Sequence, residues 1–267
     1  MMKSEVQPDH LRRLVEDFVA AYPAQAEVRA WWRKPVLATA RIDHRFEALP
    51  RIAAEDHALP RDLLPTAQSL IVFFIPFVTE LLAENRKGPR PCRNWGLAYV
   101  QTNEMITALG QALSDHLSGR GFVSAQTPAT HNFDSQRLVS RWSHKHLGHL
   151  AGLGRMGHNC QLITPAGCSG RLGSLVTEAD LGDSPLIETD QACLLKAGQD
   201  CQVCIEACPV GALSQNGLDR RRCWEYLIEN QAGNPNFADL PQTTQVCGKC
   251  VAVMPCSFKN PVAGKQG

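Results

Sequence analysis

The sequence has little net charge and no apolar stretch of membrane-spanning length. It contains 27 lysines and arginines against 26 aspartates and glutamates, which leaves a formal net charge of +1. A general nucleic-acid binder shows a basic excess or stripe, so we expect no DNA partner. The longest apolar run covers residues 70–78 and is interrupted by Pro76. Because a membrane span needs ~20 residues, we also expect no membrane partner.

An apolar leader is missing as well. Acidic residues interrupt the N-terminal segment, where a secretory signal requires an unbroken apolar stretch. We therefore expect a cytoplasmic protein. The chain of 267 residues is 44% apolar and 20% charged, which indicates a folded core instead of bulk disorder. In a reducing compartment, clustered cysteines indicate metal ligands before disulfides.

Hydrophobic spacing predicts a modest set of elements before about residue 185. Helices are predicted over residues 9–22, 103–117 and 135–153. Strands are predicted over residues 70–75, 122–125, 160–164 and 172–177. Asp9 is the predicted N-cap of the first helix and Pro23 its stop. The last two strands are expected to form a hairpin around the turn at 165–170, and residues 31–68 and 82–97 are predicted to be mainly loops.

Cysteine is concentrated at the other end of the chain. Eight of the eleven cysteines lie between positions 193 and 256, namely Cys193, Cys201, Cys204, Cys208, Cys223, Cys247, Cys250 and Cys256. Residues 201–209 read C-x2-C-x3-C-P, and a second C-x2-C stands at 247–250. Eight thiolates are what two four-iron clusters require. We therefore predict two domains, a cofactor and substrate domain at 1–185 and a ferredoxin-like domain at 186–267.

The ligand sets follow from the rule that, in two-cluster ferredoxins, the cysteine before the proline serves the other cluster. One cluster is predicted to use Cys193, Cys201, Cys204 and Cys256, and the other to use Cys208, Cys223, Cys247 and Cys250. Cys193 is assigned because Gly198 occupies the usual first position, and Cys256 because Met254 occupies the usual last one. Without Cys256, one cluster would have an open iron or only three irons. Two structural zinc sites would use the same eight residues and are the alternative.

These motifs resemble a known family. The cysteine layout and the segment GLGRMGHNCQLITPAGCSGRLGSLVT at 152–177 resemble the epoxyqueuosine reductase-like iron–sulfur proteins, which are distant relatives of the corrinoid reductive dehalogenases. The resemblance implies an α+β fold, in which an α/β nitroreductase-like cofactor domain is followed by a ferredoxin-like domain with two [4Fe–4S] clusters. It also implies that the first domain can hold a corrinoid (cobalamin), with a flavin as the second choice. No Asp-x-His-x-x-Gly run is present, so a corrinoid would bind without that histidine.

Several residues are candidates for the chemistry. Asp134 is the nearest match to the family's acidic proton donor, although the proline of that Asp-Ser-x-Pro segment is missing. His131, His144 and His146 are candidates to donate protons, to contact a cofactor or to bind a metal. The alternative is a polar helix face with one or two histidines satisfied in the core. The predicted cofactor-binding residues are Gly152, Gly154, Arg155, Gly157, Asn159 and Arg171. Cys92, Cys160 and Cys168 are left without a role.

The predicted function is that of a reductase. Electrons would pass from two [4Fe–4S] clusters to a cofactor in the first domain, which reduces a small-molecule substrate. We expect an external electron donor such as a ferredoxin, a flavodoxin or a reductase. The tRNA substrate of the family is not expected, because the net charge is near zero and the helical-repeat extension of the tRNA-modifying members is absent. A non-catalytic electron-transfer or corrinoid-handling protein, a flavin-dependent reductase and a zinc-organised interaction module are the alternatives.

Overall fold

A four-stranded sheet forms the centre of the fold. The computed structural model describes residues 4–262 except 129, 131, 188 and 254. The strands are β1 (Val36–Arg41), β2 (Ser69–Pro76), β3 (Ser124–Gln126) and β8 (Gly170–Thr177). Their order is β1-β2-β8-β3, and every pairing is antiparallel. All eight residues of β2 are buried, because this apolar strand lies inside the sheet with both faces covered.

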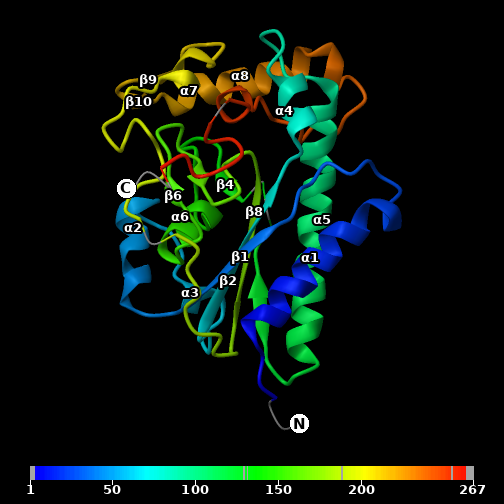
Figure 1. Cartoon of the computed structure of the whole chain (residues 1–267), viewed down its shortest axis with the longest axis vertical. Helices are drawn as coiled ribbons and strands as arrows, with labels where there is room; N and C mark the ends of the chain where they lie inside the picture. Colours follow the sequence, from blue (N-terminus) through cyan, green and yellow to red (C-terminus); the bar gives the residue numbers. More distant parts are fainter. Residues whose placement is uncertain (1–3, 129, 131, 188, 254, 263–267) are drawn as a thin grey trace.

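Helices cover both faces of the sheet (Figure 1). The first face packs against α1 (Pro8–Gln25) and α5 (Arg93–Ser118), and the second against α6 (His144–Leu150). Short elements extend the second layer, namely η1 (His44–Ala48), α2 (Leu49–Ile52) and α3 (Pro60–Leu63). Alternate residues of β2 enter the two cores: Phe73 joins the core under α5, and Phe74 joins the core under α6. This layering confirms a mixed α and β fold.

The cysteine-rich part of the chain packs across one end of this sandwich (Figure 1). Its elements are α7 (Val203–Glu206), β9 (Leu213–Ser214), β10 (Gly217–Leu218), α8 (Arg220–Gly233), η2 (Pro235–Phe237) and η3 (Lys249–Val251). Phe237, Val246 and Ala252 share a core with Trp95 of α5. A Cβ atom on Gly96 would lie 2.6 Å from Phe237, so the contact with α5 needs glycine there. The boundary at residue 185 stays a prediction.

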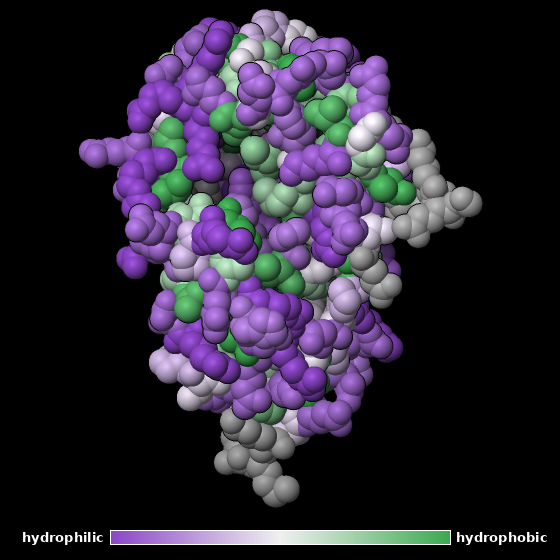
Figure 2. Space-filling model, turned by 90° about the vertical axis from the view of Figure 1, so that its left-hand side faces the viewer, coloured by the Kyte–Doolittle hydropathy of each residue, from purple (hydrophilic) through white to green (hydrophobic). Residues whose placement is uncertain are grey.

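Two small hairpins and one short helix complete the fold. The hairpins are β4 (Phe133–Asp134) with β5 (Val139–Ser140), and β6 (Arg155–Met156) with β7 (Leu162–Ile163). The short helix, α4 (Thr79–Asn85), packs beside α5. On the face shown in Figure 2, polar residues predominate, and apolar residues border a recess in the upper half. No helix in the described part of the chain has the length and apolarity to cross a bilayer.

The predicted helices differ from the observed ones in three places. The first starts after an N-cap at Gln7 instead of Asp9 and passes through Pro23 to Gln25. Asp9 lies in its first turn, where a carboxylate complements the helix dipole. The segment 82–97 was predicted as a loop, but α4 and α5 occupy most of it. Of the predicted helix at 135–153 only α6 forms, because Leu138 has a left-handed φ of 56° in the β4–β5 turn.

Strand prediction succeeded for β2, but it missed one strand and gave one wrong pairing. Residues 36–41 form β1 inside a segment predicted to be mostly loop. The predicted hairpin of 160–164 with 172–177 is wrong. Leu162–Ile163 pairs with Arg155–Met156 instead, while Gly170–Thr177 joins β2 and β3 in the central sheet. Local periodicity identifies a strand, but it does not identify which partner is adjacent to it in space.

Candidate metal centres and the adjoining cleft

Four cysteines from three separate stretches line one small cavity. These are Cys193, Cys201, Cys204 and Cys256. Cys201 and Cys204 bracket the start of α7, where the chain turns sharply, and Cys256 arrives from the C-terminal segment. Ile163, Leu194 and Val253 also line the cavity and make its walls largely apolar. The four cysteines are those that the spacing argument grouped together.

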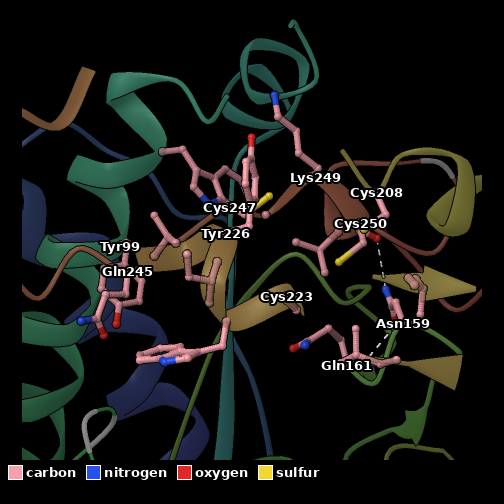
Figure 3. Close-up of a pocket in the computed structure, with 18 of the residues that line it drawn as sticks. Tyr99, Asn159, Gln161, Cys208, Cys223, Tyr226, Gln245, Cys247, Lys249 and Cys250 are labelled. Atoms are coloured by element: carbon pink, nitrogen blue, oxygen red, sulfur yellow. Dashed lines mark hydrogen bonds between the residues drawn. The ribbon is translucent and has the colours of Figure 1, made fainter. Parts of the chain in front are cut away.

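A larger cavity of about 370 Å³ contains the other four, Cys208, Cys223, Cys247 and Cys250 (Figure 3). Cys208 follows α7, Cys223 lies in the first turn of α8, and Cys247 and Cys250 flank the turn into η3. The backbone N–H of Ala212 donates a hydrogen bond of 3.2 Å to the Cys208 sulfur. Such a bond stabilises a thiolate and is one way in which a protein adjusts a cluster.

The sulfurs of each group are close enough to affect one another electrostatically. Burial, followed by the neighbouring Cys256, Cys193 and Cys201, raises the pKa of Cys204 to about 12. Burial raises the pKa of Cys247 to about 11, and all eleven cysteines are free thiols. Within the described residues, no three His, Cys, Asp or Glu side chains are placed to share a single metal ion. The two groups of cysteines therefore surround spaces instead of converging on a point.

Asn159 stands between the two groups and lines both cavities. Its Nδ2 donates to the Cys250 carbonyl at 3.2 Å and to the Cys168 sulfur at 3.7 Å. Its Oδ1 accepts from the Gln161 backbone N–H at 3.2 Å (Figure 3). Only 4% of the residue is exposed, so these bonds satisfy a buried amide. Asn159, predicted as cofactor-binding, is thus held rigidly between the cysteine groups.

Beyond the cysteines the larger cavity continues toward the central sheet. Tyr99, Phe133 and Trp224 line it, and it shares Gln161, Cys168, Gly170 and Arg171 with a second cavity of about 210 Å³. We call the two together the cleft. They bring aromatic faces and polar groups to one continuous space next to Cys208 and Cys223.

Arg171 carries a positive charge into the cleft. Its Nη2 donates to the Asn103 Oδ1 at 2.8 Å, and the guanidinium lies 4.4 Å from the centre of the Tyr99 ring. Among the described residues no carboxylate forms an ion pair with it. Burial lowers the pKa of Arg171, but a guanidinium stays charged in proteins. The remaining donors of Arg171 are suited to a phosphate or carboxylate of a bound molecule.

Of the histidine candidates, His144 lies in the wall of the second cavity but is fully engaged in hydrogen bonds. Trp142 Nε1 donates to the Ser174 hydroxyl at 3.1 Å, and that hydroxyl lies 2.8 Å from His144 Nδ1. The Nε2 atom faces the Pro128 carbonyl at 3.4 Å, so the Nε2–H tautomer satisfies all these groups. Burial lowers the pKa of His144 to about 4. The ring is therefore neutral near pH 7.

The other predicted catalytic residues are placed differently. His146 Nδ1 lies 2.8 Å from the Ser143 hydroxyl, and burial lowers the pKa of His146 to about 4. Asp134 is exposed, and its Oδ1 accepts the backbone N–H groups of Gln136 and Arg137, which lower the pKa of its carboxyl. Its neighbour Phe133 faces the cleft, whereas Asp134 does not line it. His131 lies outside the described residues.

Four of the predicted cofactor-binding residues lie away from the cleft. Gly152 has φ 72° and packs on Pro185, while a Cβ on Gly154 would lie 2.6 Å from the Ile163 oxygen. At Gly157 a Cβ would lie 2.6 Å from the Asn159 Oδ1. Arg155 donates to the carbonyls of Gly154 and Ile187. These residues hold the β6–β7 hairpin together, and their cofactor role stays a prediction.

Sequence reasoning missed Lys145, which lies inside the WSHKH segment. It lines the cleft and a further cavity that reaches Cys223. Its Nζ donates to the Cys160 carbonyl at 3.0 Å, and burial lowers its pKa. A lysine among three histidines was itself a usable sign, because a cation inside an apolar helical pattern calls for an anionic or carbonyl partner.

Gly248 sets the position of Cys247 and Cys250, and replacing it should destabilise the fold. Its φ is 72°, and a Cβ atom there would lie 2.1 Å from the Trp95 ring. We expect Gly248→Ala to lower the free energy of unfolding by about 2–5 kcal/mol, since left-handed strain adds about 1–2 kcal/mol and overpacking about 1–3 kcal/mol. Denaturant unfolding measures it.

Gly198→Ala is the matched control for that substitution. Gly198 has a similar φ of 77° with nothing within 4 Å of the added Cβ, so only the backbone strain should remain. Equal losses in the two variants would contradict the packing contribution at Trp95.

Comparison with known proteins identifies relatives of the chain. No family model matches the chain. It is 32% identical over 212 residues to an epoxyqueuosine reductase of Bacillus anthracis and 28% identical over 212 residues to that of Bacillus cereus. The chain is a homologue of the epoxyqueuosine reductases. Each alignment covers 75% of this chain and 51% of the relative, so the chain spans about half the length of the curated relatives it matches.

Solved structures show the same fold. An epoxyqueuosine reductase from Bacillus subtilis, with its catalytic loop swung out of the active site, has a TM-score of 0.54 at 18% identity, over 92% of this chain and 66% of that one. A catabolic reductive dehalogenase in complex with 3-bromo-4-hydroxybenzoic acid has a TM-score of 0.50 at 15% identity, over 72% and 27%. The chain thus shares its overall fold with an epoxyqueuosine reductase and with a reductive dehalogenase.

The expected small-molecule substrate, with tRNA set aside, is wrong. The curated relatives are named for epoxyqueuosine. Epoxyqueuosine is a nucleoside of tRNA, which is the substrate class that was set aside. The physical error lies in using net charge as a local property, because a total of +1 says nothing about where the cations gather.

Proposed function

We propose that the chain is an iron–sulfur reductase that acts on an epoxide-bearing nucleoside in tRNA. The observation that carries the proposal is the division of eight cysteines between two neighbouring cavities. Each cavity receives four thiols from separate parts of the chain. Four thiolates are what one four-iron cluster requires. The names of the relatives supply the reaction class and the substrate.

Two [4Fe–4S] clusters fit the cysteine groups better than two zinc ions. A zinc ion holds its four sulfurs at about 2.3 Å, which demands convergence on one point. The described residues offer no such point, whereas a four-iron cluster fills the space between its ligands. Cys193, Cys201, Cys204 and Cys256 would hold the first cluster. Cys208, Cys223, Cys247 and Cys250 would hold the second and give this part of the chain its ferredoxin-like role.

The cleft is the proposed corrinoid site, because it begins at the second group of cysteines. When bound, a corrinoid supplies reduction chemistry at its cobalt. Tyr99, Phe133 and Trp224 would pack against the macrocycle, and Arg171 would bind a carboxylate, amide or phosphate group at its edge. His144 would not serve as a ligand, since both ring nitrogens face partners inside the protein. A flavin in the same cleft is the alternative.

Cations at the rim support a polyanionic substrate. Arg220 and Lys145 line the cavity beside Cys223, and Arg221 and Arg222 are exposed next to it. None of the three arginines has an ion-pair partner among the residues that the structure describes. Three cations in the first turn of α8 oppose its helix dipole. Phosphate groups of a nucleic acid would relieve that repulsion.

Anaerobic purification followed by elemental analysis tests the cofactors. We expect about eight irons and eight acid-labile sulfides per chain, with no stoichiometric zinc. After incubation with cobalamin we expect about one cobalt per chain and no flavin. Zinc without sulfide would overturn the cluster assignment, and one flavin with no cobalt would replace the corrinoid by the alternative cofactor.

The activity test uses tRNA that carries epoxyqueuosine. The cobalamin-loaded protein, given a chemical reductant, should convert the nucleoside to a reduced product, detected by mass spectrometry after digestion of the tRNA. The free nucleoside is the matched control for recognition of the polyanion. If the loaded, cluster-replete protein produces no reduction of either substrate, the chain is an electron-transfer or corrinoid-handling protein instead.

A further inference from the structure

The second cavity of the cleft, with a volume of about 210 Å³, collects basic side chains without acidic ones. Lys145 and Arg171 line it, together with the amide residues Asn132 and Gln161. Within the described part of the chain, no aspartate or glutamate lines either this cavity or the larger one. The second cavity therefore brings two cations together with no negative charge to balance them.

Lys145 and Arg171 are held in place by neutral partners. The Lys145 Nζ donates to the Cys160 carbonyl at 3.0 Å, and the Arg171 Nη2 donates to the Asn103 Oδ1 at 2.8 Å. Neither side chain forms an ion pair with a carboxylate among the residues that the structure describes. A charge that is taken out of bulk water without a counter-charge is costly. We therefore expect a bound molecule to supply the negative charge.

A phosphate group fits this arrangement better than a carboxylate. The two cations come from different elements, Lys145 from α6 and Arg171 from β8. A carboxylate presents two oxygens in one plane, whereas a phosphate presents oxygens on several sides and can bind donors from different walls of a cavity. A guanidinium binds two phosphate oxygens at once, and a lysine binds phosphate as a point charge. The side-chain amide of Gln161, which lines the same cavity, is a further type of donor.

We propose that the second cavity binds the phosphate group of the cofactor that occupies the larger cavity, with Arg171 and Lys145 as its two cationic partners. This inference rests on the proposed function, because its ligand is the cofactor of the cleft. The two cavities share four lining residues, which are Gln161, Cys168, Gly170 and Arg171. One molecule can therefore extend from the aromatic part of the cleft to the cationic part. The nucleotide tail of cobalamin and the tail of flavin mononucleotide both carry such a phosphate.

Binding of two matched corrinoids tests the phosphate site. Cobinamide phosphate carries the phosphate group that cobinamide lacks. In the anaerobically purified full chain, we expect cobinamide phosphate to bind about 10–100-fold more tightly than cobinamide, which corresponds to a hydrogen bond to a charged group. Equilibrium dialysis, with the bound corrinoid measured by its absorbance, gives both dissociation constants. Equal constants would overturn the proposal.

Three variants assign this preference to the two cations. Arg171→Gln and Lys145→Gln should each lower the ratio of the two dissociation constants by about tenfold, with a much smaller effect on cobinamide itself. Arg33→Gln is the matched control and should keep the wild-type ratio. Arg33 is also partly buried, donates to the carbonyls of Phe77 and Ala166, and lines neither cavity.

The source of the phosphate is settled by the same variants. If Arg171→Gln and Lys145→Gln weaken the binding of a tRNA stem loop but leave the corrinoid ratio unchanged, the phosphate belongs to the substrate and the proposal is wrong. If neither corrinoid binds, the same preference for flavin mononucleotide over riboflavin would support the phosphate site and replace the corrinoid. Binding of none of the four compounds would overturn the proposal. Failure of the proposed function would appear separately, as the absence of iron and sulfide or of epoxyqueuosine reduction.

Discussion

Replacing Cys208 by alanine should remove one whole cluster and lower the iron content from about eight to about four atoms per chain. Cys208 lines the larger cavity with Cys223, Cys247 and Cys250, and a four-iron cluster that loses one of four ligands in a solvent-accessible cavity is expected to dissociate. Iron and sulfide analysis of the anaerobic protein measures the change. The remaining four irons should belong to the cluster of the smaller cavity.

Double variants test how the ligands are shared. Cys204 and Cys208 are four residues apart, but they line different cavities. Cys204→Ala with Cys208→Ala should therefore remove both clusters and leave almost no iron. Cys208→Ala with Cys223→Ala should remove no more iron than either single change, because both residues line the same cavity. Effects within one unit do not add, whereas effects on independent units do.

Cys92→Ala is the control for these variants. Cys92 lies outside both groups and packs against the core under α5, so the iron content should stay near eight. If the Cys204/Cys208 double variant kept about four irons, these two residues would serve one cluster, and the crossed assignment would be wrong. If Cys208→Ala alone kept eight, Cys208 would not be a ligand at all.

The sequence was most informative where chemistry constrains spacing. The C-x2-C-x3-C-P run and the second C-x2-C divided eight cysteines into two sets, and the cavities contain the same two sets. The apolar run at 70–75 likewise predicted β2, since a strand covered on both faces must be apolar throughout. The metal assignments themselves stay predictions. The grouping of the cysteines could be predicted because it follows from their local spacing and from the rule that the cysteine before the proline serves the other cluster.

The sequence was least informative where the outcome depends on contacts between distant segments. The start of α5 was predicted as part of a polar loop that contains glycine and proline, yet Phe237 and Leu240 pack where a side chain on Gly96 would be. Cys168 was left without a role, and only the fold brings it to Cys256. Neither contact has a local signature, since the segments that meet are more than 85 residues apart. The net charge led to a wrong expectation about the substrate for the same reason, because it does not say which charged residues the fold brings together.

The buried imidazole of His144 should make the stability of the fold depend on pH between about 6.5 and about 4. Burial lowers the pKa of His144 from 6.5 to about 4, so the unfolded chain binds a proton in this range that the folded chain does not. The contribution is fully present above pH 6.5 and is lost as the pH falls to about 4. The shift corresponds to about 3 kcal/mol, at 1.36 kcal/mol per pKa unit. Denaturant unfolding at a series of pH values measures it.

The quantity to compare is the difference between the wild type and His144→Gln, which removes the titrating group but keeps a donor and an acceptor near Ser174. On acidification from pH 7 to pH 4, the wild type should lose about 3 kcal/mol more than the variant. Any acid loss of clusters affects both proteins and cancels in the difference. His44→Gln changes an exposed position in η1. Its free energy of unfolding should depend on pH in the same way as that of the wild type. Parallel curves for wild type and His144→Gln would mean that the imidazole is hydrated in the folded protein and that the hydrogen bonds to Ser174 and Pro128 do not enclose it.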